Sequence, residues 1–287
     1  MTLGSILILA GRREGAIDPL AAAHGVADKC LVPVAGRPMI AHILEAAERS
    51  GAARIFISSH APDLLSHMAD PVIERLEARL SLLEAADNLA DSVLAVAEHA
   101  DFPLLITTAD NCLLSAASIA KIGDEALRLG AGGGVAFARR EDVLAVHPAG
   151  QRRFYEFSDV AVSNCNAYWI GNASALRAAE AFRGGGQFVK KPLRVLRAFG
   201  FINLLRFRFG MGPIHHIFQR LSKKLGVKVA PLIISDGRAA IDVDHDRSLR
   251  VTEQIMAASP LVSQTANCHE TPVEHGVEDG LPLALIR

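Results

Sequence analysis

Short uncharged apolar runs alternate with longer segments of helical spacing along the first half of the chain. Ser5 to Ala10 is apolar and uncharged, as is typical of a strand buried on both faces of a parallel sheet. Met39 to Arg49 carries apolar residues three and four positions apart, and Ser50-Gly51 is a helix stop. The same patterns predict strands at 54–59, 80–84, 102–107 and 133–139, and helices that end near residues 80, 99 and 129. Strands alternating with helices indicate an α/β fold with a mostly parallel sheet flanked by helices.

The second half of the chain has a less regular pattern. We expect antiparallel strands within 151–162, strands at 166–170, 228–234 and 239–243, and helices at 173–182 and 246–258. A Gly-rich break at 184–186 introduces a basic and apolar helical insertion, residues 188–226. The length of 287 residues fits one domain, residues 1–258, followed by a tail, 259–287, whose small and polar residues predict poor order.

Composition narrows the class of protein. A net charge of −1 argues against general nucleic-acid binding, which usually needs a strongly basic balance. No segment approaches the roughly 20 apolar residues of a spanning helix. Four dispersed cysteines without a C-x-x-C pair are typical of reduced thiols, so we expect a cytoplasmic protein. The histidines lack zinc-ligand spacing, and the adjacent pair His215-His216 cannot place both rings on one helix face.

The loop after the first strand has the composition of a phosphate-binding loop. It contains two glycines, Gly11 and Gly15, and two arginines, Arg12 and Arg13. Bare backbone N–H groups and guanidinium forks both suit phosphate oxygens. Lys29 adds a point charge further along, and a helix follows Pro38.

This N-terminal region resembles the nucleotidyltransferases of GT-A-like fold, which include MobA-like and sugar-phosphate nucleotidylyltransferases. The resemblance is strongest in the second part of the signature, at Lys29, Leu31, Pro33, Val34, Gly36, Pro38 and Met39. In the first part, Arg12 occupies the place of the family's second glycine. The resemblance implies a Rossmann-like (GT-A-type) fold and a Mg²⁺-dependent transfer of a nucleotidyl group from an NTP, with CTP and GTP both compatible, to a small phosphorylated acceptor. It also implies a nucleotide site along Leu9, Ala10, Gly11, Arg12 and Gly15, with Arg13 and Lys29 as catalytic cations.

Three aspartates are candidate metal ligands. Asp110 follows an apolar strand, where open α/β sheets place their ligand sites. Asp242 and Asp244 alternate at the end of a second apolar run, on one strand face. The resemblance assigns Mg²⁺ to Asp110 together with Asp242 or Asp244, of which Asp242 is narrowly preferred, whereas Asp246 reads as a helix N-cap. The competing interpretation makes Asp110 a helix cap or a solvated loop residue.

Weaker candidates complete the site. Asn88 and Ser92 lie where the resembling family reads the nucleobase, although both are also ordinary helix-capping residues. Asn164 and Asn166 precede a short strand that resembles the family's acceptor strand. Lys190 and Lys191 are further candidates for an acceptor phosphate.

The insertion leaves the choice of function open. Nine Lys or Arg residues and no Asp or Glu lie between positions 190 and 224, interleaved with apolar and aromatic residues. Such a segment suits a core-packed insertion with solvated basic edges, an acceptor pocket, an oligomer interface or peripheral membrane contact. The alternatives to a nucleotidyltransferase are a GT-A-fold glycosyltransferase and a non-catalytic nucleotide-binding or membrane-associated protein.

Overall fold

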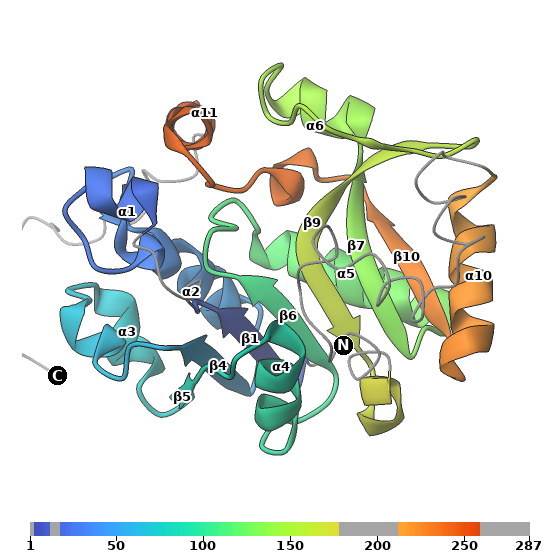
Figure 1. Ribbon diagram of the computed structural model, residues 1–287, viewed down its shortest axis with the longest axis horizontal. Coiled ribbons are helices and arrows are strands. Elements are labelled where there is room, and N and C mark those ends of the chain that lie inside the picture. Colours follow the sequence, from blue (N-terminus) through green and yellow to red (C-terminus); the bar gives the residue numbers. More distant parts are fainter. Residues whose placement is uncertain (1–2, 12–17, 178–211, 259–287) are drawn as a thin grey trace, which may run out of the picture.

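A computed structural model describes residues 3–11, 18–177 and 212–258 (Figure 1). Several predictions fall outside these residues. They are the tail, most of the insertion, and five of the candidate site residues: Arg12, Arg13, Gly15, Lys190 and Lys191.

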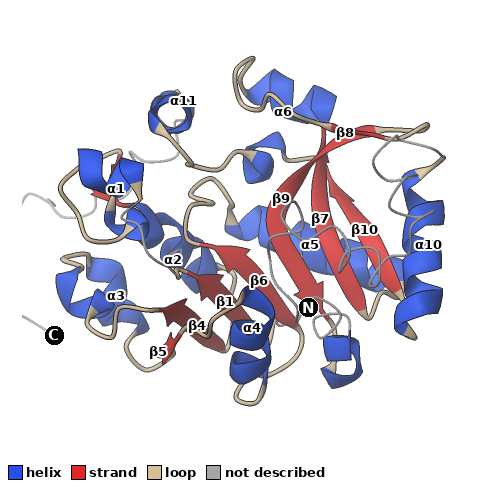
Figure 2. Cartoon of the chain, viewed as in Figure 1, coloured by secondary structure: helices blue, strands red, loops and turns tan. Residues whose placement is uncertain are grey.

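One sheet runs through the described part of the chain in the order β10-β7-β9-β6-β1-β4-β5, with β8 paired to β9 (Figure 2). Its strands are β1 (Ser5–Leu9), β4 (Arg54–Ser59), β5 (Leu80–Glu84), β6 (Leu104–Thr108), β7 (Gly133–Arg139), β8 (Tyr155–Glu156), β9 (Ala161–Ile170) and β10 (Val229–Ile234). Strands β6, β1, β4 and β5 are mutually parallel, as are β7 and β10, whereas β9 is antiparallel to both its neighbours β6 and β7. The predicted mostly parallel α/β sheet is therefore confirmed.

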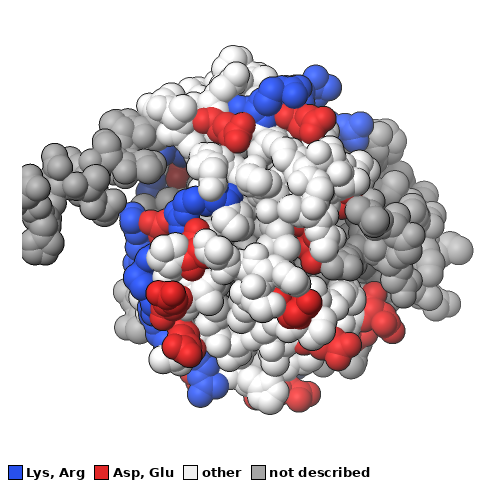
Figure 3. Space-filling view, turned by 90° about the vertical axis from the view of Figure 1, so that its left-hand side faces the viewer, with Lys and Arg blue, Asp and Glu red and all other residues white. Residues whose placement is uncertain are grey.

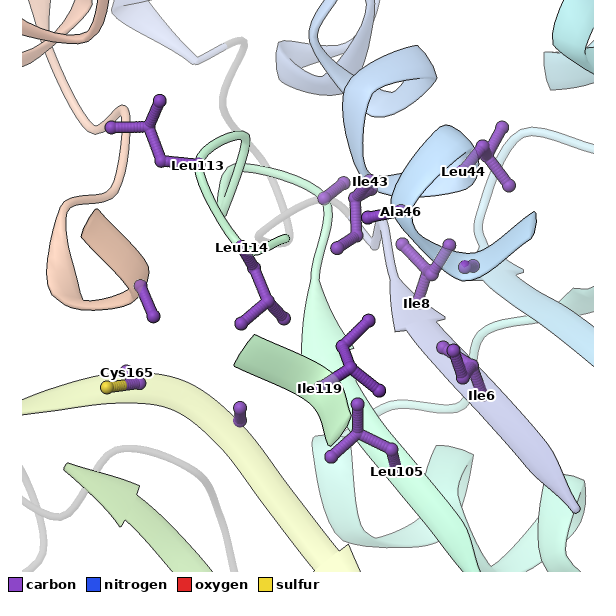
Figure 4. Packing of buried hydrophobic residues seen from close by; sticks show 14 of the residues in the cluster. Ile6, Ile8, Ile43, Leu44, Ala46, Leu105, Leu113, Leu114, Ile119 and Cys165 are labelled. Carbon is purple, nitrogen blue, oxygen red and sulfur yellow. The ribbon is translucent and has the colours of Figure 1, made fainter. Parts of the chain in front are cut away.

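Helices cover both faces of the sheet, which is why its central strands are apolar throughout. Ile6 and Ile8 of β1 pack on one face with α2 (Met39–Arg49), α3 (Pro71–Leu76) and α5 (Ala116–Leu129), whereas Leu7 packs on the other with α4 (Leu89–Ala97). The close-up in Figure 4 shows Leu113 and Leu114, from the loop after β6, among the core side chains of the first face. These two leucines anchor the loop that carries Asp110.

The second half of the chain departs from the prediction in two places. The strand expected at 239–243 is wrong: η4 (Gly237–Ala240) is a 3-10 helix, capped by the Asp236 side chain, which accepts from the Arg238 backbone N–H at 3.1 Å. Its apolar residues are buried because this segment packs against α6 (Arg140–Val146), so closely that a Cβ at Gly237 would lie 2.2 Å from the Asp142 carbonyl oxygen. The two strand pieces expected around 151–170 are instead the short β8 and the ten-residue β9.

The remaining helices lie at the edges of this core. They are α1 (Pro19–Ala23), where the sequence suggested only a loop, η1 (Lys29–Leu31), η2 (Leu64–His67), η3 (Ala173–Ala175), α10 (Ile214–Leu225) and α11 (Asp246–Ala257). The apolar side of α10, from the end of the basic insertion, packs on the sheet, with the rings of Phe218 and Phe137 6.1 Å apart at nearly a right angle. The apolar face of this part of the insertion is therefore buried in the protein's own core.

Charged side chains are mixed in sign on the side that lies to the left in Figure 1. Figure 3 shows acidic and basic side chains interspersed there. Arg37 exemplifies the pairing, because its guanidinium donates to both Asp70 (2.9 Å) and Glu45 (2.6 Å). Within the described ranges, no helix is long and apolar enough to span a bilayer.

Candidate functional site

The carboxyl ends of β1 and β6 form the floor of the candidate site. Ala10 donates its backbone N–H to Ser58, and Ala109 donates to Leu9, so the chain segments leaving β1 and β6 start side by side. Gly11 lies two residues after the end of β1 and is exposed. Leu9, Ala10 and Gly11 thus lie at the sheet edge where the resemblance places the nucleotide.

The signature segment from Lys29 to Met39 forms a short hairpin that ends in a helix. Strands β2 (Pro33–Val34) and β3 (Arg37–Pro38) pair antiparallel across a turn at Ala35 and Gly36, both with positive φ (48° and 79°). The positive φ at position 36 explains the glycine there, because residues with a side chain rarely adopt positive φ. The helix predicted after Pro38 begins at Met39. Lys29 opens η1 immediately before this hairpin.

Lys29 bridges two of the predicted metal aspartates. Its Nζ donates to Asp110 Oδ2 at 2.6 Å and to Asp244 Oδ1 at 2.7 Å. Burial alone would lower the pKa of Lys29, but the adjacent Asp110 and Asp244 carboxylates outweigh burial and raise it above its ordinary value. Lys29 is therefore a fully charged ammonium that holds together residues 81 and 215 positions away in the chain.

Asp110 is fixed on both oxygens. Besides the bond from Lys29, its Oδ1 accepts from the Thr108 hydroxyl at 2.5 Å. Its side chain is 19% exposed, against 60% for Asp244. The N-cap of α5 is Ser115, so the interpretation of Asp110 as a helix cap is wrong.

Asp242 accepts hydrogen bonds from two side-chain amides. Its Oδ2 accepts from Asn166 Nδ2 at 3.0 Å and its Oδ1 from Gln151 Nε2 at 3.3 Å. Burial, followed by the negative charges of Asp244 and Asp110, raises the pKa of Asp242 to about 6. The three aspartates therefore share one electrostatic environment, although the backbone around Asp242 is not the strand that was predicted.

The start of α11 differs by one residue from the prediction. His245, not Asp246, is the N-cap: its Nδ1 accepts from the Ser248 backbone N–H at 3.2 Å, and the Ser248 hydroxyl oxygen accepts from the His245 backbone N–H at 3.1 Å. The Asp244 backbone N–H also donates to the Ser248 hydroxyl, at 2.8 Å. Ser248 therefore fixes the backbone that presents Asp244.

The candidate nucleobase residues have structural contacts of their own. Asn88 is the N-cap of α4, and its Oδ1 accepts from the Asp91 backbone N–H at 3.0 Å. The buried Ser92 hydroxyl accepts from the Ala86 backbone N–H at 2.9 Å. Contact with a base stays a prediction for both residues.

Sequence reasoning missed two side chains of this site. Thr108 stands where the resembling family has an aspartate, and its hydroxyl orients Asp110 instead. Gln151 lies in the segment before β8 and reaches Asp242 across 91 positions of sequence. Thr108 lies two residues before Asp110 in the same motif, so its place in the sequence was a signal for it. Gln151 belongs to no motif, and no local pattern could have indicated it.

The donor set fits a hard divalent cation that brings other ligands with it. Mg²⁺ prefers oxygen ligands and is usually bound through one or two carboxylates plus phosphates and water. Across residues 3–11, 18–177 and 212–258, no group of three or more His, Cys, Asp and Glu side chains forms a metal-holding cluster. Asp110 and Asp242 could therefore supply two ligands of Mg²⁺, with water or the oxygens of a nucleotide completing its coordination.

The raised pKa of Asp242 leads to a testable pH dependence of stability. Because the folded-state pKa lies above the ordinary value, the contribution of Asp242 is fully favourable below about pH 4 and is lost as pH rises through 6. Asp242→Asn cannot ionise, so its melting temperature minus that of the wild type should increase by several degrees from pH 5 to pH 8. The underlying change is about 1–3 kcal/mol.

The measurement is thermal unfolding of both proteins in EDTA across this range. Gln151 and Asn166 donate to residue 242, and the change in these bonds shifts the melting temperature of the variant by an amount that does not depend on pH. Burial lowers the pKa of His42, but His42 titrates in both proteins, so its effect cancels in the difference. A melting-temperature difference that stays constant with pH would contradict the prediction.

The sequence is similar to one known protein family. A family model for MobA-like NTP transferase domains matches residues 7–196, a range that includes Lys29 and Asp110 and ends before Asp242. No protein with a curated description matches the sequence.

Solved structures share the fold. A hypothetical transferase from Thermus thermophilus is 24% identical, with a TM-score of 0.71 over 86% of this chain and 100% of its own. A CMP:2-keto-3-deoxy-manno-octonic acid synthetase complexed with CTP is 12% identical, with a TM-score of 0.51 over 88% of this chain and 98% of its own. A 4-diphosphocytidyl-2C-methyl-D-erythritol synthase from Anaerococcus prevotii is 10% identical, with a TM-score of 0.53 over 89% of this chain and 99% of its own.

These similarities show a Rossmann-like nucleotidyltransferase fold, as the resemblance implied. The family match covers about two thirds of the sequence and includes the loop, the hairpin and the first aspartate of the site. The chain belongs to the family of MobA-like NTP transferase domains.

Proposed function

We propose that the protein is a Mg²⁺-dependent nucleotidyltransferase that transfers a nucleoside monophosphate from an NTP to a small phosphate ester. The observation that carries the proposal is the Lys29 bridge between Asp110 and Asp244 at the carboxyl edge of a nucleotidyltransferase sheet. It brings a full positive charge and two carboxylates to the place where the loop after β1 would present a triphosphate.

The reaction needs alignment and charge neutralisation more than covalent chemistry. An oxygen of the acceptor phosphate attacks the α-phosphorus, a new P–O–P linkage forms, and the α–β bridging bond breaks in line to release pyrophosphate. Lys29, freed from one carboxylate, would neutralise charge developing on the α-phosphate. Arg12 and Arg13 are proposed to bind the β- and γ-phosphates.

Mg²⁺ would be held by Asp110 and Asp242 together with phosphate oxygens, where it would neutralise charge on the triphosphate. Thr108 keeps one oxygen of Asp110 oriented, and Asn166 does the same for Asp242. Asp244 is the most exposed of the three, so it is the weaker choice of ligand.

The direct test measures pyrophosphate release from each of the four NTPs with a panel of phosphorylated polyols and sugars, with and without Mg²⁺. CTP is tried first, since two structural neighbours are named for cytidyl products, and GTP second. We expect one NTP and acceptor pair to give metal-dependent pyrophosphate and a diphosphate-linked product. In parallel reactions with a nucleotide sugar in place of the NTP, consumption of the nucleotide sugar without pyrophosphate release would instead favour the glycosyltransferase. No turnover with any NTP and acceptor pair would refute the proposal.

A further inference from the structure

Strand β9 contains an irregularity directly beside the candidate metal site. Its register against β7 shifts between two pairs, Val135 with Tyr168 and Phe137 with Asn164, so that three residues of β9 face a single residue of β7. Asn166 lies in this bulge with a φ of 47°, one of two non-glycine residues with positive φ in the described part of the chain. Such a backbone is uncommon for a residue with a side chain and is typical of bulges that re-aim a side chain.

The bulge aims the Asn166 amide at Asp242. Its Nδ2 donates to Asp242 Oδ2 at 3.0 Å. The neighbouring Asn164 fixes which way this amide faces, because Asn164 Nδ2 donates to Asn166 Oδ1 at 3.3 Å and Asn164 Oδ1 accepts from the Asn166 backbone N–H at 3.1 Å. Asn164 also donates to the Tyr168 hydroxyl at 3.1 Å. With the carbonyl end of the Asn166 amide occupied in this way, only its N–H end is left to face the carboxylate.

Gln151 contacts the other oxygen of the same carboxylate. Its Nε2 donates to Asp242 Oδ1 at 3.3 Å and to the Ala240 carbonyl at 3.1 Å. A carboxylate has about four lone-pair directions, so one amide on each oxygen still leaves room for a metal. The two amides therefore define the orientation of Asp242 without blocking coordination.

The same bulge is tied to the other metal candidate. The buried Asn111, next to Asp110, donates from Nδ2 to the Cys165 carbonyl at 2.6 Å. A backbone bond from Val243 N–H to the Asp110 carbonyl, 3.1 Å, joins the two aspartate-bearing segments directly. One irregular stretch of β9 thus contacts both segments that carry the carboxylates.

We propose that Asn166 and Gln151 are positioning residues that hold the Asp242 carboxylate in its metal-binding orientation, through the β9 bulge. The inference rests on the proposed metal site and gives Asn166 a role other than acceptor contact. Neither residue is expected to touch the substrate.

The test compares Mn²⁺ binding, without nucleotide, to the wild type, Asn166→Gly and Gln151→Ala, by the electron paramagnetic resonance signal of free Mn²⁺. Glycine suits the positive φ at 166, so that variant should fold while losing the amide. We expect affinity to fall about tenfold to a hundredfold for Asn166→Gly, the range for partners of metal ligands, and about tenfold for Gln151→Ala, whose hydrogen bond to Asp242 is longer.

Matched controls use exposed residues of the same types. Asn172→Gly at η3 and Gln254→Ala on α11 remove an amide away from the site and should leave Mn²⁺ affinity unchanged. Raising Mg²⁺ should restore most of the turnover of Asn166→Gly, because only orientation of the ligand is lost. A purely structural defect would not respond to metal in this way.

The possible results separate this inference from the proposed function. Unchanged Mn²⁺ affinity in both site variants overturns the positioning role, as does a wild type that binds no Mn²⁺. Pyrophosphate release by the wild type decides the proposed function independently. Weakened Mn²⁺ binding without release from any NTP would support the positioning role and refute the nucleotidyltransferase.

Discussion

Asparagine in place of Asp110 is expected to lower metal-dependent pyrophosphate release by about a thousandfold, the scale seen when charge stabilisation of a transition state is removed. The substitution keeps the shape of the side chain and an oxygen that can still accept from Thr108. It removes the negative charge that pairs with Lys29 and would anchor the metal. The loss should therefore appear mainly in kcat and be only partly recovered by high Mg²⁺.

Asp124→Asn is a suitable control, because Asp124 is an exposed aspartate on α5, away from the site. Turnover and thermal unfolding should both stay near wild-type values in this variant. Asp110→Asn should also remain folded, since its loop is anchored by Leu113 and Leu114 in the core. If Asp110→Asn turns over at the wild-type rate, Asp110 is not part of the chemistry.

Methionine in place of Lys29 should produce two effects of opposite sign. Turnover should fall by about a hundredfold to a thousandfold, because the charge proposed to neutralise the α-phosphate is gone. Mn²⁺ binding without nucleotide should become about tenfold tighter, since the ammonium bonded to Asp110 and Asp244 no longer competes with a cation for these carboxylates.

Measurements of kcat and of Mn²⁺ affinity on one preparation test this pair of effects. Lys121→Met, which changes an exposed lysine on α5, provides the matched control and should alter neither. A general folding defect would weaken both properties together. Weaker Mn²⁺ binding by Lys29→Met would show that the ammonium supports the metal site and does not compete with it.

Much of the first half of the fold could be predicted from local pattern, because most of its elements bury one face or both. The helix 39–49 and the strands 54–59 and 80–84 match the prediction residue for residue. In these elements the apolar residues that set the periodicity of the sequence are the residues that pack against the rest of the structure. Asp110 could be selected because it follows an apolar strand, and Lys29 because it stands in the segment that resembles the family signature.

The rest of the site depends on contacts that no local pattern records. The apolar run 239–243 is buried by tertiary packing and not by strand pairing: η4 packs against α6, and Val243 packs in a cluster with Val34 and Met39. Its strand-like composition was therefore misleading. The polar middle of β9, around Asn164 and Asn166, concealed a continuous strand, because these side chains bond to each other and to Asp242. The role of Gln151 follows only from the fold that brings it to Asp242.

The Lys29–Asp244 bond also has a consequence for when the site forms during synthesis. The two residues are 215 positions apart, which at about 5–20 residues per second corresponds to roughly 10–40 seconds of translation. During that interval the nascent chain already has the loop after β1 and Lys29, but lacks Asp242 and Asp244. We expect a ribosome-bound chain that ends before residue 242 to be inactive, with assembly of the centre as a late step of folding.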